Sequence, residues 1–170
     1  MSQFSNNRDE NPSRPIRATA QALLAQREHS TADLARKLTK RRYEQEAIDA
    51  LMQELTQKGL LDDDRFAEMY IRMRSERGMG PLRIRAELQQ QGIARETIKA
   101  SLMQSDEIWI KTAALAREKR FGKRSLSAEE ELKQRRFLEY RGFAIDTVNT
   151  VLKSLKGAPH AFEEHDPENA

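Results

Sequence analysis

Apolar residues recur along this chain every three or four positions, the spacing of amphipathic helices, and no stretch alternates as a strand would. Residues 80–93 carry the signals for both ends of one short helix. Pro81 suits the first helical position, where its missing N–H is not needed, and Gly92 suits the position just past the end. The pattern therefore predicts a short helix here and helices throughout the chain.

The apolar positions around this helix recur at a fixed offset of 50 residues in both directions. The following positions align without a gap: Leu82, Leu88, Gly92, Ile93, Ile98 and Leu102 with Leu132, Leu138, Gly142, Phe143, Val148 and Leu152, and Leu88, Ile93, Ile98 and Leu102 with Leu38, Tyr43, Ile48 and Met52. A period of this size is typical of repeat proteins. We therefore predict an all-α fold, an elongated array of three tandem three-helix repeats in which each repeat contacts only its neighbours.

Start and stop signals place the predicted helices. We expect them at about 16–28, 30–38, 44–58, 64–77, 81–91, 94–104, 105–122, 127–141 and 144–156. Capping boxes open two of them, at Ser30–Asp33 and Ser127–Glu130. Six of the seven glycines fall at predicted helix ends, where glycine reaches a positive φ without strain: Gly59, Gly78, Gly92, Gly122, Gly142 and Gly157. The repeats are expected at 15–61, 62–104 and 105–157, between disordered segments at 1–14 and 158–170.

Charge adds a candidate partner class. The chain carries a net charge of +3, and residues 157–170 contain four acidic residues and no Lys or Arg, so residues 1–156 carry +7. A basic body favours polyanions or an acidic protein surface as partners, although charge also serves solubility alone. Arg83 aligns with Lys133 at the 50-residue offset, whereas the first repeat has Asp33 there. A helical wheel places Arg83 on the polar face, and we expect these positions to face solvent.

No pattern indicates catalysis or metal binding. The three histidines are scattered and there is no cysteine. Gly78-Met79-Gly80 lacks the strand and the Lys-Ser/Thr ending of a phosphate loop. We therefore expect no enzyme, no cofactor and no metal site. The chain shows no signal peptide and no 18-residue apolar stretch, so we expect a cytoplasmic protein without membrane contact.

Three-helix units also suggest helix-turn-helix DNA binding, in which the third helix enters the major groove. The third helix of the first repeat carries acidic residues that would repel phosphates: Glu44, Glu46, Asp49 and Glu54. The positive charge lies on first and second helices instead. A stand-alone nucleic-acid-binding helical protein is kept as the alternative function.

Three stretches resemble the RecX family of bacterial recombinase regulators. They are 60–67 (LLDDDRFA), 80–88 (GPLRIRAEL) with 91–93 (QGI), and 136–143 (RFLEYRGF). The resemblance covers about residues 16–155 and implies a fold of tandem three-helix repeats. It also implies binding in the helical groove of the RecA filament, with DNA contact secondary, and restraint of recombination, ATP hydrolysis and co-protease activity in DNA repair and the SOS response.

The resemblance implies no catalytic residues, and contact residues carry over only loosely, as the basic positions inside the matching motifs. Gln91 departs from the family pattern, in which a basic residue commonly precedes the glycine, and so does the acidic segment at 158–170. We expect a monomer that turns the basic side chains of the second and third repeats toward the filament: Arg72, Arg74, Arg83, Lys133, Arg136 and Arg141.

Overall fold

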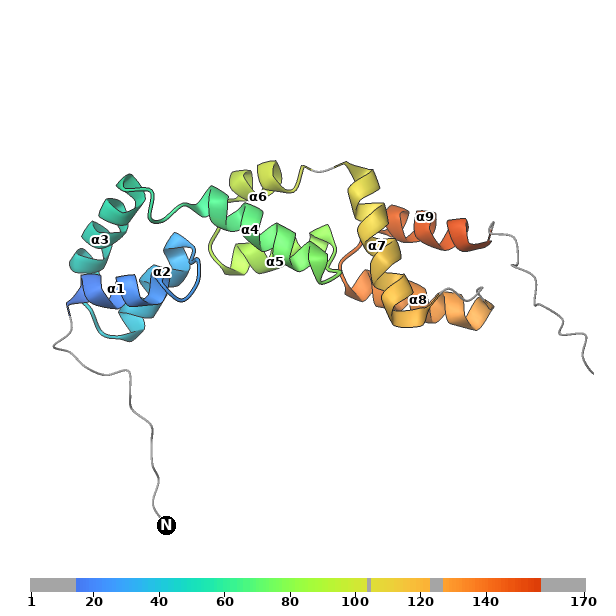
Figure 1. Cartoon of the computed structure of the whole chain (residues 1–170), viewed down its shortest axis with the longest axis horizontal. Helices are drawn as coiled ribbons and strands as arrows, with labels where there is room; N and C mark the ends of the chain where they lie inside the picture. Colours follow the sequence, from blue (N-terminus) through green and yellow to red (C-terminus); the bar gives the residue numbers. More distant parts are fainter. Residues whose placement is uncertain (1–14, 104, 123–126, 157–170) are drawn as a thin grey trace, which may run out of the picture. The chain divides into compact units, whose positions relative to one another are not determined.

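The computed structural model describes residues 15–103, 105–122 and 127–156, and these residues form nine α-helices and no strand (Figure 1). The helices are α1 (Ile16–Leu24), α2 (Thr31–Lys40), α3 (Gln45–Gln57), α4 (Asp63–Glu76), α5 (Pro81–Gln90), α6 (Arg95–Ser101), α7 (Asp106–Phe121), α8 (Ala128–Tyr140) and α9 (Ile145–Lys156). The predicted all-α fold is confirmed for these ranges. The elongation of the array and the boundaries of the repeats stay predictions, and the segments 1–14 and 158–170 lie outside the described residues.

Two helices are shorter than predicted. α1 ends at Leu24 instead of residue 28, because His29 and Ser30 are buried against the start of α2. α6 ends at Ser101 instead of residue 104. The predicted capping box at Ser127 is complete, since the Ser127 hydroxyl accepts from the Glu130 N–H at 3.3 Å and the Glu130 carboxylate accepts from the Ser127 N–H at 3.0 Å. At Ser30 only the first of these two bonds forms, from the Asp33 N–H at 3.0 Å.

The chain folds as two compact units. The described part of the first unit is 15–73 with 85–103, and that of the second is 74–84 with 105–122 and 127–156. α4 and α5 therefore contribute residues to both units.

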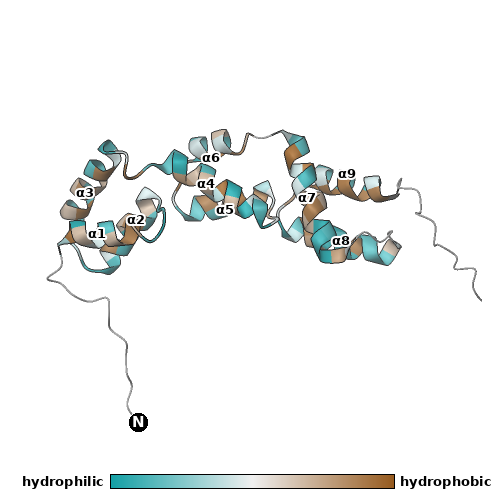
Figure 2. Ribbon diagram, in the orientation of Figure 1, coloured by the Kyte–Doolittle hydropathy of each residue, from teal (hydrophilic) through white to brown (hydrophobic). Residues whose placement is uncertain are grey.

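Each unit buries the apolar positions that recur at the 50-residue offset, and Figure 2 shows hydrophobic and hydrophilic residues alternating along the helices as one-sided burial requires. The first unit buries Leu38, Ile48, Met52, Leu88, Ile93, Ile98 and Leu102. The second buries Leu138, Phe143, Val148 and Leu152. The hydrophobic period therefore identified part of the core in both units, and this core stabilises the fold by removing apolar surface from water.

On α7 the apolar residues do not mark the buried face. Trp109, Ala113 and Arg117 are buried at four-residue spacing, whereas Ile108 is half exposed and Leu115 is 67% exposed. Leu115 lies two residues beyond Ala113, about 200° around the helix. The alanine and the arginine occupy the inner face, so apolar character alone does not identify the buried face of this helix.

Leu82 and Leu132 align at the 50-residue offset, yet both are half exposed. Leu82 contributes its main chain, since its N–H donates to the Gly142 carbonyl at 3.0 Å. Ile84, two residues further on, is the buried side chain of this helix start.

The junctions between consecutive repeats use aligned positions. In the first unit, the start of α2 lies on the end of α5, where the Ser30 hydroxyl donates to the Gln91 carbonyl at 2.6 Å. In the second unit, the start of α5 lies on the end of α8, where the Gly80 N–H donates to the Arg141 carbonyl at 2.8 Å. Ser30 aligns with Gly80, and Gln91 with Arg141, at the 50-residue offset. Positions that align in the sequence repeat thus make equivalent contacts at the two junctions.

Candidate partner-binding surface

One face of α8, in the second unit, carries an exposed basic and aromatic surface. Lys133, Arg136 and Tyr140 follow one another at three- and four-residue spacing, so they share a face of the helix. Tyr140 is 75% exposed. The Arg83 guanidinium lies 5.2 Å from the centre of its ring, and Arg83 donates to the Tyr140 carbonyl at 3.4 Å. We name these four residues the α8 strip.

The lysine of the strip is paired but remains accessible. Lys133 Nζ lies 2.7 Å from the Glu129 carboxylate, and its side chain is 65% exposed. The hydrogen bond to Glu129 raises the pKa of Lys133, and the same bond lowers the pKa of Glu129. An exposed pair of this kind contributes little to stability. A partner can therefore compete for Lys133 at small cost to the fold.

Arg83 is not the purely solvent-facing side chain that the helical wheel predicted. It is half buried, because its backbone and Cβ lie against Gly142 at the repeat junction. Its guanidinium still reaches the surface over Tyr140, where a cation over an aromatic face is attracted to the ring. Arg83 thus combines a structural contact with a surface position.

Arg141 turns away from the strip into a second feature of the same unit. It donates to the Arg77 carbonyl at 2.8 Å, and its guanidinium lies 5.0 Å from the centre of the Phe137 ring. Both side chains line a groove of about 530 Å³, with Lys119 and Arg120. We name this the basic groove. Phe137 is half buried and forms part of its wall.

The remaining predicted contact residues lie on α4. Arg72 is exposed in the first unit, and Arg74 is half buried in the last turn, in the second unit. The structure therefore brings Arg83, Lys133 and Arg136 to the α8 strip and sends Arg141 to the basic groove.

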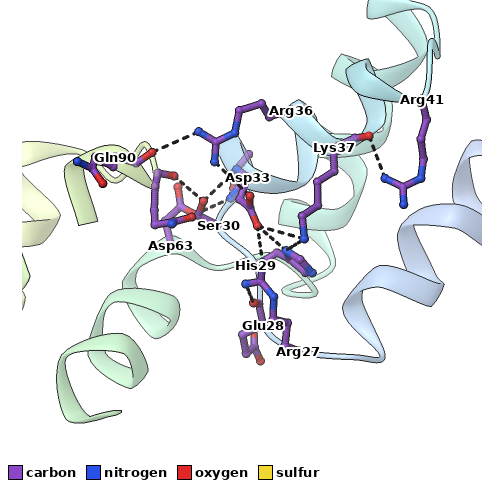
Figure 3. Close-up of polar contacts among 12 residues, drawn as sticks. Arg27, Glu28, His29, Ser30, Asp33, Arg36, Lys37, Arg41, Asp63 and Gln90 are labelled. Atoms are coloured by element: carbon purple, nitrogen blue, oxygen red, sulfur yellow. Dashed lines mark hydrogen bonds and ion pairs between the residues drawn. The ribbon is translucent and has the colours of Figure 1, made fainter. Parts of the chain in front are cut away.

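Asp33, which aligns with Arg83, is buried and not a polar surface position as the alignment suggested. His29 Nδ1 lies 2.7 Å from its carboxylate, and Arg27 and Arg36 each lie 3.1 Å from it (Figure 3). Burial alone would raise the pKa of Asp33, but the hydrogen bonds from His29 and Arg36 and the charges of Lys37 and Arg27 outweigh it and lower that pKa to about 2. Asp33 is a structural ion-pair centre.

The same region fastens the first repeat to the second within the first unit. The Thr31 N–H donates to the Asp63 carboxylate at 2.8 Å, and Arg36 donates to the Gln90 carbonyl at 3.2 Å (Figure 3). The acidic residues at 62–64, expected to cap α4, thus also receive a donor from α2.

No group of three His, Cys, Asp or Glu residues in the described ranges could hold a metal ion. Among the same residues, no helix is long and apolar enough to cross a membrane.

Comparison with known proteins decides the family. Residues 17–55 match the family model "RecX, first three-helix domain", and residues 62–102 match "RecX, second three-helix domain". "Regulatory protein RecX" of Halorhodospira halophila is 41% identical over 140 residues, covering 82% of this chain and 87% of that protein. The chain belongs to the RecX family. A Pseudomonas putida protein of the same name is 41% identical over 138 residues, covering 81% of this chain and 88% of its own.

Solved RecX structures share the fold. The crystal structure of RecX from Lactobacillus salivarius has a TM-score of 0.73 at 21% identity and covers 83% of this chain and 94% of its own. A second crystal structure of regulatory protein RecX has a TM-score of 0.67 at 25% identity, covering 82% and 72%. The relatives are named as regulatory proteins.

Sequence reasoning assigned no contact to Tyr140 of the α8 strip or to Lys119 and Arg120 of the basic groove. Tyr140 was quoted within the RecX motif at 136–143 but not assigned a contact, although an aromatic residue seven positions after Lys133 must share its helix face. Lys119 and Arg120 belong to a basic run on α7, and only the packing of α7 against α8 places them beside Arg141.

Proposed function

We propose that this protein is a regulator that binds the RecA filament and restrains its recombination, ATPase and co-protease activities. Membership of the RecX family is the observation that supports this most strongly. The protein acts in the cytoplasm and contacts DNA only secondarily, within the filament.

The contact residues that we propose are the α8 strip, Arg74 and Arg141 in the second unit and, separately, Arg72 in the first unit. Arginine and tyrosine are the residues that most often carry the binding energy of protein interfaces. A guanidinium can pair with a carboxylate or a phosphate through two parallel hydrogen bonds. The half-exposed Leu82 beside Arg83 adds apolar area, which a protein surface uses better than a phosphate backbone does. This composition favours a protein partner over bare DNA.

Several weak contacts on successive filament subunits would add by multivalency. Attraction between a basic surface and a charged groove would speed association and weaken as salt screens it. Inhibition should therefore decline with rising ionic strength before the protein loses its fold.

The test is the ATPase rate of a RecA filament on single-stranded DNA, with the parent protein and with the double variant Lys133→Glu/Arg136→Glu. Both side chains are exposed on α8, so far-UV circular dichroism and the melting temperature should stay close to those of the parent. We expect inhibition to weaken at least tenfold. Arg83 is left unchanged because its contacts at the repeat junction would confuse a loss of binding with a loss of packing.

The matched control is Lys40→Glu, which reverses an exposed charge at the end of α2 in the first repeat. It should inhibit like the parent. If the double variant also inhibits like the parent, the α8 strip is the wrong surface. If the parent leaves the filament ATPase unchanged but binds bare single-stranded DNA, the stand-alone nucleic-acid-binding function replaces the proposed one.

A further inference from the structure

The basic groove of the second unit has the features of a docking site for a peptide. Its volume of about 530 Å³ lies between the end of α4, the second half of α7 and the end of α8. Leu115 and Phe137 give it apolar walls, and Leu115 is 67% exposed. An apolar side chain can therefore be accommodated there.

The charge of the groove lining favours a ligand that carries carboxylates next to that apolar side chain. Four cationic side chains line the groove, Arg77, Lys119, Arg120 and Arg141, against one carboxylate, Glu76. The Arg141 guanidinium is held by the Arg77 carbonyl and lies over Phe137, so it is positioned before any ligand arrives. A segment with an aromatic or aliphatic residue beside carboxylates is complementary to this lining.

We propose that the basic groove binds the acidic segment 158–170 of the same chain. That segment contains Phe162 followed directly by Glu163 and Glu164, then Asp166 and Glu168, and no Lys or Arg. In the proposed docked form, Phe162 would enter between Leu115 and Phe137, and the two glutamates would pair with Lys119 and Arg120.

The reach of the chain agrees with this occupant. α9 begins at Ile145, shortly after the groove residue Arg141, and its 12 residues run for about 18 Å before Lys156. Residues 157–162 span up to about 20 Å when extended. Residues 157–162 are therefore about as long as α9, so the segment that follows the helix is long enough to run back along it toward the end that lies next to Arg141 in the sequence. Because the segment is tethered, its effective concentration at the groove is in the millimolar range.

Docking of the segment would cover part of the surface that we propose for filament binding. Arg141 belongs both to this groove and to the surface proposed for filament binding, so a docked segment 158–170 would compete with a filament for it. That consequence rests on the proposed function, whereas docking itself does not.

The experiment uses the full chain with the photoreactive residue p-benzoylphenylalanine in place of Phe162. We expect illumination to cross-link it to peptides containing residues 112–120 or 137–141, identified by mass spectrometry. The double variant Lys119→Glu/Arg120→Glu, exposed in the last turn of α7, should reduce the yield at least fivefold, and so should 0.5 M NaCl. Lys40→Glu in the first repeat is the control and should leave the yield unchanged.

Cross-links spread over the chain, or a yield that the Lys119→Glu/Arg120→Glu variant does not change, would overturn the proposal. Cross-linked dimers whose share rises with protein concentration would show that the groove takes the segment of a second copy, which also contradicts docking within one chain. No recombinase is present, so failure here is distinguishable from failure of the proposed function.

Discussion

Gly92 lies so close to Ala32 that a Cβ on the glycine would stand 2.4 Å from the alanine Cβ. At the aligned junction in the second unit, a Cβ on Gly142 would stand 2.5 Å from the Arg83 Cβ. Both glycines also adopt a left-handed backbone, with φ of +81° and +89°. At each of these two junctions glycine is therefore required for two reasons: the backbone is left-handed, and there is no space for a Cβ.

We predict that Gly92→Ala and Gly142→Ala destabilise the protein more than Gly59→Ala. All three glycines have positive φ, a conformation that costs an L-residue about 1–2 kcal/mol, but a Cβ on Gly59 meets nothing within 4 Å. The junction variants should lose that amount plus the cost of displacing the neighbouring repeat. Urea unfolding checks this prediction, and equal losses for Gly92→Ala and Gly59→Ala would show that the close approach is absent.

Helix positions were predictable because their signals are local. The capping serine at 127, the proline at 81 and the glycine stops each act within a few residues of themselves, and the structure places helix ends beside them. The positive φ predicted for Gly92 and Gly142 is confirmed. The hydrophobic period found the core for the same reason, since burial on one face of a helix imposes its own spacing.

The role of Asp33 was not predictable, because its partners come from the turn before α2 as well as from α2 itself. The alignment with Arg83 suggested a position that faces solvent. Instead the carboxylate lies among His29, Arg27 and Arg36. Asp33→Lys would place a cation in this cluster, so it is a destabilising variant and no control for the α8 strip.

We predict that Asp33→Asn lowers the free energy of unfolding by on the order of 2 kcal/mol at pH 7. The pKa of Asp33 is lowered to about 2 in the fold, against about 3.9 in an unfolded chain. Its stabilisation is therefore fully present above pH 4–5 and is lost as the pH falls toward 2. The gap between parent and variant should narrow over that window in urea unfolding at several pH values. A gap that stays constant from pH 7 to pH 2.5 would contradict the ionic role.

Leu115 is exposed although it is apolar, because the buried face of α7 is occupied by Arg117. Arg117 Nε donates to the Gln134 side chain at 2.7 Å, and Arg117 also donates to the Gly122 carbonyl at 2.7 Å. Burial lowers the pKa of Arg117, yet arginine remains charged in proteins. Sequence patterns treat arginine as a surface residue, so only the pairing across α7 and α8 reveals this one as part of the core.

We predict that Arg117→Leu alone costs about 2–4 kcal/mol, because it leaves the buried Gln134 amide without this donor. Replacing both residues, as Arg117→Leu/Gln134→Leu, should cost less than the sum of the single changes by at least about 1 kcal/mol. A double-mutant cycle from urea unfolding measures this coupling. Additive losses would mean that the two side chains do not stabilise each other.

From the sequence alone, the candidate site could be narrowed to basic residues of the second and third repeats and no further. Composition located the basic residues, and helical spacing places Lys133 and Arg136 on one face of α8. Spacing could not show that Arg83 lies over Tyr140 or that Arg141 turns toward Arg77, because both contacts join residues more than 50 positions apart.

The first repeat has an arginine at the position where the second and third repeats have these glycines, so the requirement for glycine can be tested there. Arg42 aligns with Gly92 and Gly142 at the 50-residue offset and shares their left-handed backbone, with φ of +63°, but it is exposed. Where nothing approaches as Ala32 approaches Gly92, a side chain is tolerated at the cost of local strain alone.

We therefore predict that Arg42→Gly leaves the free energy of unfolding unchanged or raises it by up to about 1 kcal/mol, since relief of the left-handed strain outweighs or balances the added entropy of the unfolded chain. The reverse change, Gly92→Arg, keeps the same backbone but must displace Ala32, and it should cost more than about 3 kcal/mol. Urea unfolding of the two variants side by side measures the contrast. If Arg42→Gly destabilises the protein, the arginine side chain makes a contact that stabilises the fold. If Gly92→Arg costs little free energy of unfolding, the junction between Gly92 and Ala32 has space for a side chain.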